Sequence, residues 1–226
     1  MRAPVDPEVL PHDPDFPAQR GPALAPARLQ AAALRERFAR TEDWQTEQDS
    51  DGRLFLPHRD VRPAAVLIGL LPQPEGLHVV FTVRSAHLND HAGQISFPGG
   101  RVEVTDATHV AAALREAHEE VALAPAQIEV LGTLPPYLTV SGYAVTPVVG
   151  LIAADARLAA DPLEVQETFS VPLAYLMDSA NHQRRIVVTE PRPRGLYAIE
   201  YWGARRYLIW GATAAMLRNF YRFLRA

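Results

Sequence analysis

Gly99-Gly100 and, fifteen residues later, Arg115-Glu116-Ala117-His118-Glu119-Glu120-Val121 form a tight turn that leads into a helix. At about 100° per residue, Glu116, Glu119 and Glu120 share one face of that helix. Like charges at this spacing destabilise a bare helix unless a cation holds them. Carboxylate oxygens gathered in one place suit Mg²⁺ or Mn²⁺. The stretch therefore predicts a helix with a metal-binding acidic face.

The composition limits the chemistry that the chain can perform. Its 226 residues, of which 48% are hydrophobic and 21% charged, are typical of one soluble globular domain. All 22 basic residues are arginines, which excludes a P-loop lysine, a Schiff-base lysine and a lysine general base. The sequence has no cysteine, which excludes thiol nucleophiles, disulfides and thiolate metal sites.

Charge and hydropathy bear on location and partners. The N-terminus lacks the apolar core of a signal peptide, and no apolar run reaches the roughly 18 residues of a membrane span. We therefore expect a cytoplasmic enzyme with no membrane partner. The net charge is −4, but residues 181–226 contain nine arginines and two acids. The acidic body argues against nucleic-acid binding, whereas the basic tail is either a contact for phosphate or an acidic partner, or a solvated or subunit-contact face.

The chain is predicted to form one domain over residues 27–226, with N-terminal and C-terminal helical additions. Residues 1–26 contain seven prolines, too many for regular structure, and predict a Pro-rich extended arm. Two short apolar runs, 64–71 and 77–83, predict a buried hairpin. Further strands are predicted at 128–134, 143–153, 165–170, 184–189 and 196–201, helices at 27–40, 105–121 and 209–224, and a polar loop at 41–57. This order favours an α+β fold, an α/β/α sandwich with a mixed β-sheet between helices.

The stretch from Gly100 to Leu123 resembles the Nudix box, G-x5-E-x7-R-E-U-x-E-E-x-G-U, in which U is an apolar residue. The chain departs from this pattern at two positions. Asp106 replaces the usual glutamate, with eight residues instead of seven before Arg115, and Ala122 replaces the usual glycine. Because aspartate is favoured at helix starts, we predict that Asp106 is the N-cap. Ala122 matters only if its φ is positive, which alanine resists.

An upstream motif narrows the resemblance to the coenzyme A pyrophosphatase branch of the Nudix family. The similar residues are Thr82-Val83-Arg84-Ser85, Leu88, His91, Gly93-Gln94 and Phe97-Pro98-Gly99-Gly100. That branch also tends to carry an aspartate after the glycine turn, with the longer spacing seen here. The resemblance implies a Nudix fold and metal-dependent hydrolysis of the diphosphate linkage of coenzyme A or its derivatives. The products would be 4′-phosphopantetheine and adenosine 3′,5′-bisphosphate.

The resemblance also implies a set of metal ligands. Glu116 and Glu120, one helical turn apart, are the expected ligands, with Mg²⁺ or Mn²⁺ as cofactor. Glu119 is expected to be a third ligand or the base that activates water. Nudix enzymes further use a backbone carbonyl of the glycine turn as a ligand, which corresponds here to Gly100.

Other residues are implied around this centre. Arg115 is expected to pair with a helix carboxylate and fix its rotamer, and Arg84 to contact the substrate. Some family members recruit a base from a distant loop, for which Glu164 and Glu167 are the candidates. The Arg-rich stretch 184–206 is the candidate for binding a 3′-phosphate. Homodimers are frequent in the family, so a homodimer is one expected assembly.

Two alternatives remain open. A Nudix pyrophosphatase of another nucleoside diphosphate derivative, such as a dinucleotide, ADP-ribose or a nucleoside triphosphate, would carry the same box, because the box defines the reaction better than the leaving group. A non-catalytic Nudix-like binding module is less favoured, since a module that had lost catalysis would not need the intact charge cluster.

Overall fold

The computed structural model describes residues 5–40, 43–47, 61–85, 93–188 and 193–226. Most of the predicted loop 41–57, and Leu88 and His91 of the upstream motif, lie outside these ranges. Within them, no helix combines the length and the apolar character needed to cross a membrane.

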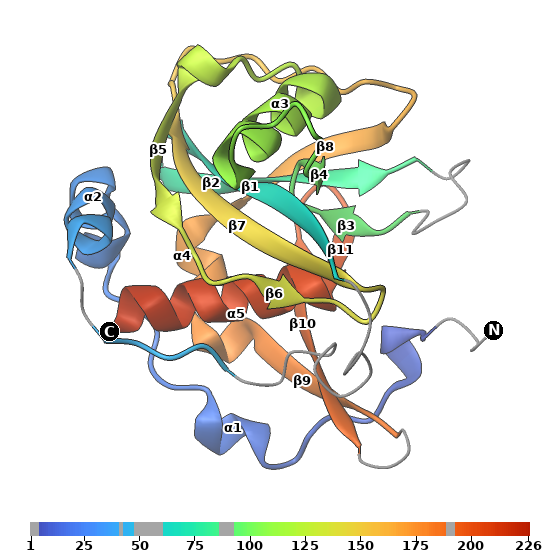
Figure 1. Ribbon diagram of the computed structural model, residues 1–226. Helices are drawn as coiled ribbons and strands as arrows, with labels where there is room; N and C mark the ends of the chain where they lie inside the picture. The colour runs from blue at the N-terminus through green and yellow to red at the C-terminus, as the bar shows by residue number, and fades with distance from the viewer. Residues whose placement is uncertain (1–4, 41–42, 48–60, 86–92, 189–192) are drawn as a thin grey trace.

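In the described part of the chain, a mixed sheet of eight strands forms the centre of the molecule (Figure 1). Strands β1 (Arg62–Gln73) and β2 (Gly76–Arg84) form the predicted antiparallel hairpin, and β1 pairs in parallel with β7 (Tyr143–Ile152). The other strands are antiparallel to their partners: β3 (Ile95–Ser96), β4 (Gly99–Arg101), β5 (Ile128–Thr133), β6 (Tyr137–Leu138) and β8 (Val165–Pro172). The predicted α+β class with a mixed sheet is confirmed.

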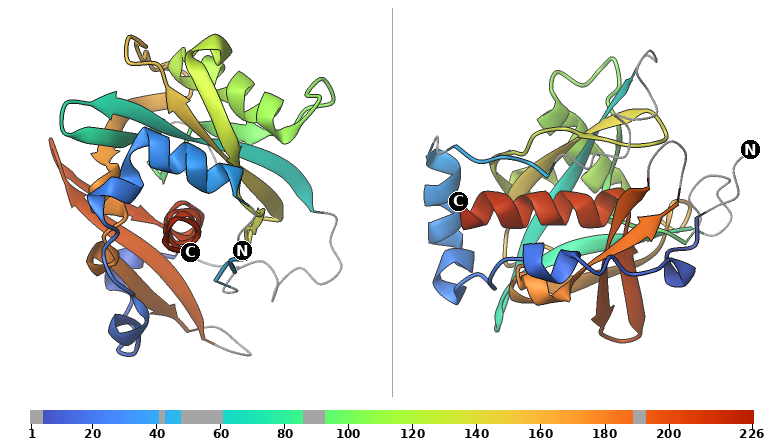
Figure 2. Two further views of the ribbon diagram at one scale, coloured as in Figure 1. Left: turned by 90° about the vertical axis from the view of Figure 1, so that its left-hand side faces the viewer. Right: turned by 90° about the horizontal axis from the view of Figure 1, so that it is seen from below.

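The side chains of β1 alternate between two hydrophobic clusters, one on each face of the sheet. Ala65 and Leu67 pack with helix α3 (His109–Val121), whereas Ile68 packs on the opposite face with helix α5 (Ala212–Arg225). Figure 2 shows these two helices on opposite sides of the sheet. Burial on both faces explains why the strands of the hairpin are continuous apolar runs.

Helix α3 begins after Thr108, whose side-chain oxygen accepts a hydrogen bond of 3.0 Å from the Ala111 N–H. The prediction that Asp106 caps this helix is therefore wrong. Asp106 instead accepts two hydrogen bonds from Arg115, at 3.1 Å from Nε to Oδ1 and 2.9 Å from Nη2 to Oδ2. Threonine is also a good N-cap, so Thr108 caps the helix while Asp106 binds the guanidinium of Arg115.

Helix α3 ends at Ala122, which adopts the left-handed conformation with φ 56° and ψ 24°. The N–H groups of Ala122 and Leu123 close the helix by donating to the carbonyls of His118 and Ala117, at 3.0 and 3.3 Å. A β-carbon in this conformation costs roughly 1–2 kcal/mol.

We expect Ala122→Gly to raise the free energy of unfolding by about 1 kcal/mol, because glycine relieves this strain. Thermal unfolding should show a Tm that is about 2–4 °C higher. As a control, Ala111→Gly lies at a helical position of the same helix and should lower the stability by about 1 kcal/mol. A Tm for Ala122→Gly at or below that of the wild type would contradict the strain at this position.

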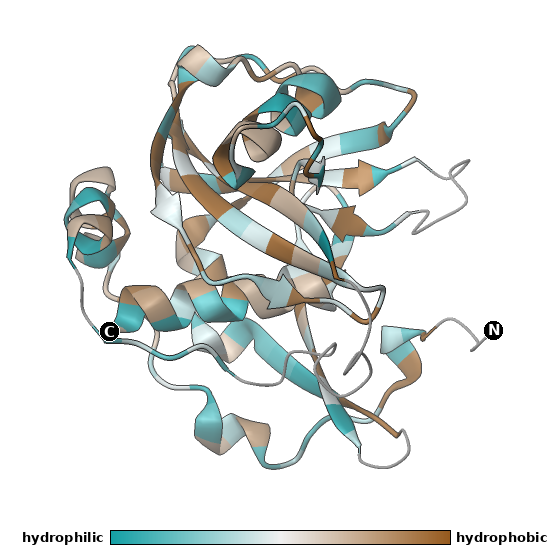
Figure 3. Cartoon of the chain, in the orientation of Figure 1, coloured by the Kyte–Doolittle hydropathy of each residue, from teal (hydrophilic) through white to brown (hydrophobic). Residues whose placement is uncertain are grey.

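A second, smaller sheet lies beyond α5 and consists of β9 (His182–Val187), β10 (Arg194–Trp202) and β11 (Arg206–Trp210). Strand β11 was not predicted, because the terminal helix was expected to start at Ile209. Ile209 instead pairs with Ile199 of β10, and the helix starts after Gly211, which has a φ of 65°. Figure 3 shows that β9 is mostly hydrophilic, unlike β1, β2 and β7 of the central sheet. The remaining short helical elements are η3 (Pro125–Gln127), α4 (Leu173–Leu176) and η4 (Ser179–Asn181).

The N-terminal segment contains more regular structure than the predicted arm. Its helical turns are η1 (Pro7–Val9), α1 (Phe16–Gln19) and η2 (Pro26–Leu29), followed by α2 (Ala31–Ala39), the predicted first helix. Phe16 is only 2% exposed and packs edge-on against Tyr197 of β10, with ring centroids 5.6 Å apart. The segment is therefore packed against the second sheet instead of extending into solvent.

Candidate active site

The glycine turn lies directly against the acidic face of α3. The Gly99 N–H donates a hydrogen bond of 3.1 Å to Oε2 of Glu120. A β-carbon on Gly99 would lie 2.5 Å from the carbonyl oxygen of Ala65 in β1, and one on Gly100 would collide with the carboxylate of Glu116. Glycine is therefore required at Gly99, because the clash there is with backbone, whereas a side chain at Gly100 would displace the carboxylate of Glu116.

Glu120 is buried beside this turn, and Glu116 is partly buried next to it. Glu120 is 6% exposed, and burial raises its pKa to about 8, with further contributions from the negative charges of Glu116 and Glu164. Burial is also the main reason that the pKa of Glu116 is raised, and Glu119 and Glu164 add to it. A local positive charge would stabilise the ionised form of both groups.

Arg115 supplies part of that positive charge and organises the acidic groups around itself. Besides the two bonds to Asp106, its Nη1 donates to Glu116 Oε1 at 3.0 Å and to Glu119 Oε2 at 2.8 Å. Its Nη2 also donates to the carbonyl oxygen of Arg101 in β4, at 3.1 Å. These hydrogen bonds and charges raise the pKa of Arg115 and lower that of Asp106. Asp106 therefore anchors the guanidinium against the helix, a role that the local sequence did not indicate.

The third glutamate points differently from the other two. The side chain of Glu119 is 54% exposed and is held by Arg115, one turn back on the helix. Among the residues that the structure describes, no three carboxylate, imidazole or thiol groups converge as a metal-binding set. The predicted ligands Glu116 and Glu120 thus lie together beside Gly100, whereas Glu119 lies at the solvent side of the same helix face.

Residues far away in the sequence also reach this centre. The positive charge of Arg84, at the end of β2, opposes the rise in the pKa of Glu120, and the negative charge of Glu164 adds to the rise in the pKa of Glu116 and Glu120. Glu167 faces the second sheet instead, where Arg205 Nη2 and the Tyr207 hydroxyl donate to it at 2.7 and 2.5 Å. Of the two candidates for a distant base, the structure therefore brings only Glu164 to the carboxylate cluster.

The pattern of the Nudix box is thus built into one compact arrangement of turn, strand and helix. A protein-family model described as "NUDIX domain" matches residues 60–186 of the chain. The chain belongs to the Nudix family. Its mixed sheet between helices is the Nudix fold, and the chain is a Nudix hydrolase. Nudix hydrolases act on small nucleotide derivatives and generally use divalent metal ions.

Curated relatives agree with this assignment. The chain is 44% identical over 159 residues to an uncharacterized Nudix hydrolase, NudL, of Escherichia coli K12. The matched region covers 70% of this chain and 80% of the relative. The same identity and coverage hold for NudL of Shigella boydii serotype 18. Among solved Nudix structures, RenU of M. smegmatis is 25% identical, with a TM-score of 0.43 over 51% of this chain and 73% of that one. A MutT/nudix family protein of Enterococcus faecalis is 14% identical, with a TM-score of 0.46 over 87% and 75% of the two chains.

Proposed function

We propose that this Nudix hydrolase cleaves the diphosphate linkage of coenzyme A or an acyl derivative, using Mg²⁺ or Mn²⁺. The products are 4′-phosphopantetheine and adenosine 3′,5′-bisphosphate. The observation that carries the proposal is the position of the upstream motif: Arg84 acts on Glu120 through its charge, and Gly99 binds the same carboxylate. The motif that resembles the coenzyme A branch therefore belongs to the same site as the Nudix box.

The backbone of the upstream motif supports this assignment. The N–H of Arg84 donates to the Gln94 carbonyl, and the N–H of Gly93 donates to the Arg84 carbonyl, both at 3.0 Å. The N–H of Ser85 donates to the carbonyl of Glu164 at 2.9 Å. The three segments that hold Arg84, Gln94 and Glu164 are thus tied to one another, which fixes the position of Arg84 relative to the glutamates.

The residues at the site fit a divalent cation. Glu120 is buried and Glu116 partly buried, the pKa of both carboxylates is raised, and the negative charge of Glu164 contributes to both shifts. A hard cation is the partner that such oxygen ligands favour. Glu116 and Glu120 would hold it, with Glu119 and the carbonyl of Gly100 as the further ligands that the resemblance implies. When bound, the cation would neutralise charge on the diphosphate and lower the pKa of a water molecule.

The protein side chains then have separate tasks. Arg115 holds Glu116 and Glu119 in fixed rotamers through its hydrogen bonds. Arg84 carries a positive charge toward the site and is suited to bind a substrate phosphate. Glu119 and Glu164 are the candidates for accepting a proton from the attacking water, because both carboxylates lie close to Glu116 and Glu120 and are themselves exposed.

The substrate assignment is tested by incubating the purified protein with coenzyme A, an acyl-coenzyme A, ADP-ribose and a dinucleoside polyphosphate, each with Mg²⁺ or Mn²⁺. Mass spectrometry of the products should show adenosine 3′,5′-bisphosphate and 4′-phosphopantetheine or its acyl form. We expect the highest kcat/KM for the coenzyme A compounds. Equal or faster turnover of ADP-ribose or the dinucleotide would reject the substrate while leaving the hydrolase in place.

A further inference from the structure

We infer that Arg62 and Arg101, arranged around the ring of Tyr143, bind a phosphate monoester of the substrate that lies outside the cleaved diphosphate. This inference rests on the proposed function, in which that group is the 3′-phosphate of the adenosine moiety. The phosphate would then be recognised at the first residues of β1 and β7, Arg62 and Tyr143, and at the last residue of β4, Arg101. The Arg-rich stretch 184–206 would not bind it.

The three residues meet because their strands are neighbours. In the sheet, Arg62 is opposite Tyr143 on one side, and Ala64 is opposite Arg101 on the other. The guanidinium carbon of Arg62 lies 4.1 Å from the centre of the Tyr143 ring, and that of Arg101 lies 5.6 Å from it. Arg101 Nε also donates a hydrogen bond of 2.8 Å to the Tyr143 hydroxyl. One aromatic ring thus positions two cationic groups.

These two guanidiniums lack the acidic partners that other arginines have. Within the described ranges, Arg62 donates to the Ser141 carbonyl, at 3.2 Å, and Arg101 to the tyrosine hydroxyl, and neither forms an ion pair. Each guanidinium carries five N–H donors, so most of their donors face solvent. Two positive charges held beside one ring, without a carboxylate between them, form a site for an anion.

Three arginines of the stretch 184–206 are engaged in ion pairs. Arg205 pairs with Glu167 at 2.7 Å, and Arg206 pairs with Glu8 and Glu200 at 2.8 and 3.0 Å. Arg184 pairs with Asp13. These pairs hold the second sheet to the N-terminal segment and to β8. Binding a phosphate to these three arginines would require breaking existing ion pairs, which makes them poor recognition residues.

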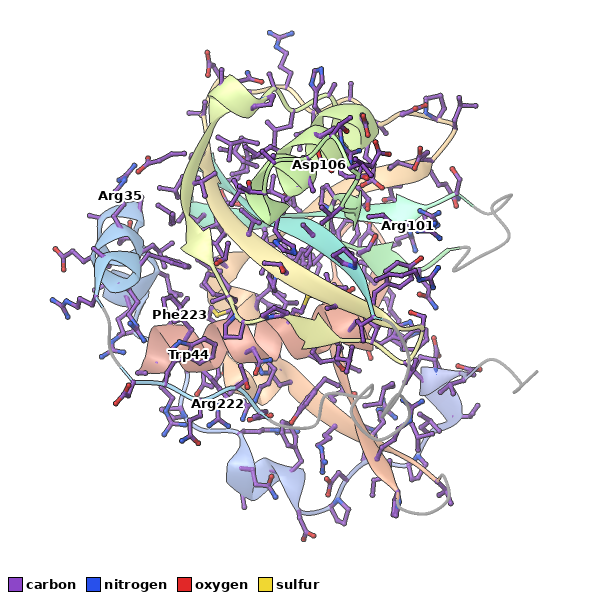
Figure 4. The ribbon with its side chains drawn as sticks, viewed as in Figure 1. Arg35, Trp44, Arg101, Asp106, Arg222 and Phe223 are labelled. Atoms are coloured by element: carbon purple, nitrogen blue, oxygen red, sulfur yellow. The ribbon has the colours of Figure 1, made fainter. Side chains whose placement is uncertain are left out.

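The pair formed by Arg62 and Arg101 is also close to the cleavage centre. Arg101 directly follows Gly100, and its carbonyl accepts a hydrogen bond from Arg115 at 3.1 Å. Figure 4 shows Arg101 on the same side of the molecule as Asp106, which Arg115 binds, and far from Arg35 on α2. A substrate whose diphosphate is held at the glutamates can therefore place its phosphate monoester near Arg62 and Arg101. A monoester carries nearly two negative charges and three acceptor oxygens, which matches two guanidinium groups.

The test compares ligands that differ by this single phosphate. Calorimetry measures binding of adenosine 3′,5′-bisphosphate and of adenosine 5′-monophosphate to the wild type, to Arg62→Gln/Arg101→Gln and to the control Arg35→Gln, which removes an exposed arginine on α2. We expect the wild type and the control to prefer the bisphosphate by about 30-fold, the size of a charge-assisted contact. The double variant should lose most of that preference. The two single variants should show intermediate losses, and circular dichroism checks that every variant is folded.

A kinetic arm separates this inference from the proposed function. The ratio of kcat/KM for coenzyme A to that for 3′-dephospho-coenzyme A should fall about 30-fold in the double variant. Turnover of coenzyme A with an unchanged ratio would retain the proposed function and overturn the phosphate site. Preferential binding of the bisphosphate that depends on both arginines, without turnover of coenzyme A, would retain the site and reject the proposed reaction. Equal binding of both nucleotides by the wild type would overturn the inference.

Discussion

Replacing Glu120 with glutamine is expected to lower kcat by more than about 100-fold while the protein stays folded. Substitutions of residues that only support a metal ligand typically cost 10–100-fold, so the loss of a ligand itself should cost more. Glutamine preserves the shape of the buried side chain and can still accept the hydrogen bond from Gly99. It removes only the charge. Initial rates with saturating Mg²⁺ or Mn²⁺ measure the effect.

The fold of this variant provides an independent check. Because burial raises the pKa of Glu120 to about 8, the ionised carboxylate destabilises the metal-free protein at higher pH. The metal-free variant should therefore unfold at a Tm no lower than that of the wild type at pH 8.5. Glu36→Gln, on the exposed surface of α2, serves as the matched control and should keep normal turnover. Near-normal turnover by Glu120→Gln would contradict the carboxylate pair as the reaction centre.

Arg218→Met is expected to lower the free energy of unfolding by about 3–5 kcal/mol. Arg218 is 2% exposed on α5 and bonds to Glu47 at 2.8 Å. It also donates to the carbonyls of Gln19 and Arg20, at 3.0 and 2.8 Å. Burial alone would raise the pKa of Glu47, but the hydrogen bonds and charge of Arg218 hold it below its usual value. Removing the guanidinium leaves the partly buried carboxylate of Glu47 with only Arg222 and the Tyr197 hydroxyl as partners, and it takes a donor from each of the two carbonyls.

Urea unfolding measures this loss, and two further variants define its origin. Glu47→Gln/Arg218→Met removes both charges and should recover part of the stability, because no partly buried carboxylate is then left without the Arg218 guanidinium, whereas Arg222 alone would still pair with Glu47 in the single variant. Arg35→Met breaks an ion pair with Glu129 whose two side chains are about half exposed, and should cost less than about 1 kcal/mol. A loss in Arg218→Met no larger than that in Arg35→Met would show that the buried network does not stabilise the fold.

The sequence was most informative where one local pattern is sufficient. The apolar runs of the hairpin, 64–71 and 77–83, became β1 and β2 because both of their faces are buried, and the helix expected at 105–121 became α3. The placement of Glu116 and Glu120 on one helix face follows from the helical repeat alone. The glycine turn could also be anticipated, since only glycine allows the observed approach of β4 to the carboxylates.

Local sequence patterns gave wrong or missing predictions where contacts between distant residues determine the structure. Asp106 and Thr108 are both good helix caps, and the choice between them depends on Arg115, nine residues after Asp106. Strand β11 was missed because its apolar residues run directly into those of α5, with only Gly211 between them. The arrangement of Arg62, Tyr143 and Arg101 depends on the pairing of three strands, which no single stretch of sequence reveals.

The attachment of the N-terminal segment to α5 bears on how the protein is made. Besides the contacts of Arg218, the Tyr221 hydroxyl donates to the Pro22 carbonyl at 2.6 Å, and Arg28 donates to the carbonyls of Leu224 and Arg225 at 3.0 and 2.8 Å. Arg28 and Leu224 are 196 residues apart in the sequence, so the ribosome releases this segment long before α5. The segment therefore has no binding surface on α5 until these intervening residues have been synthesised.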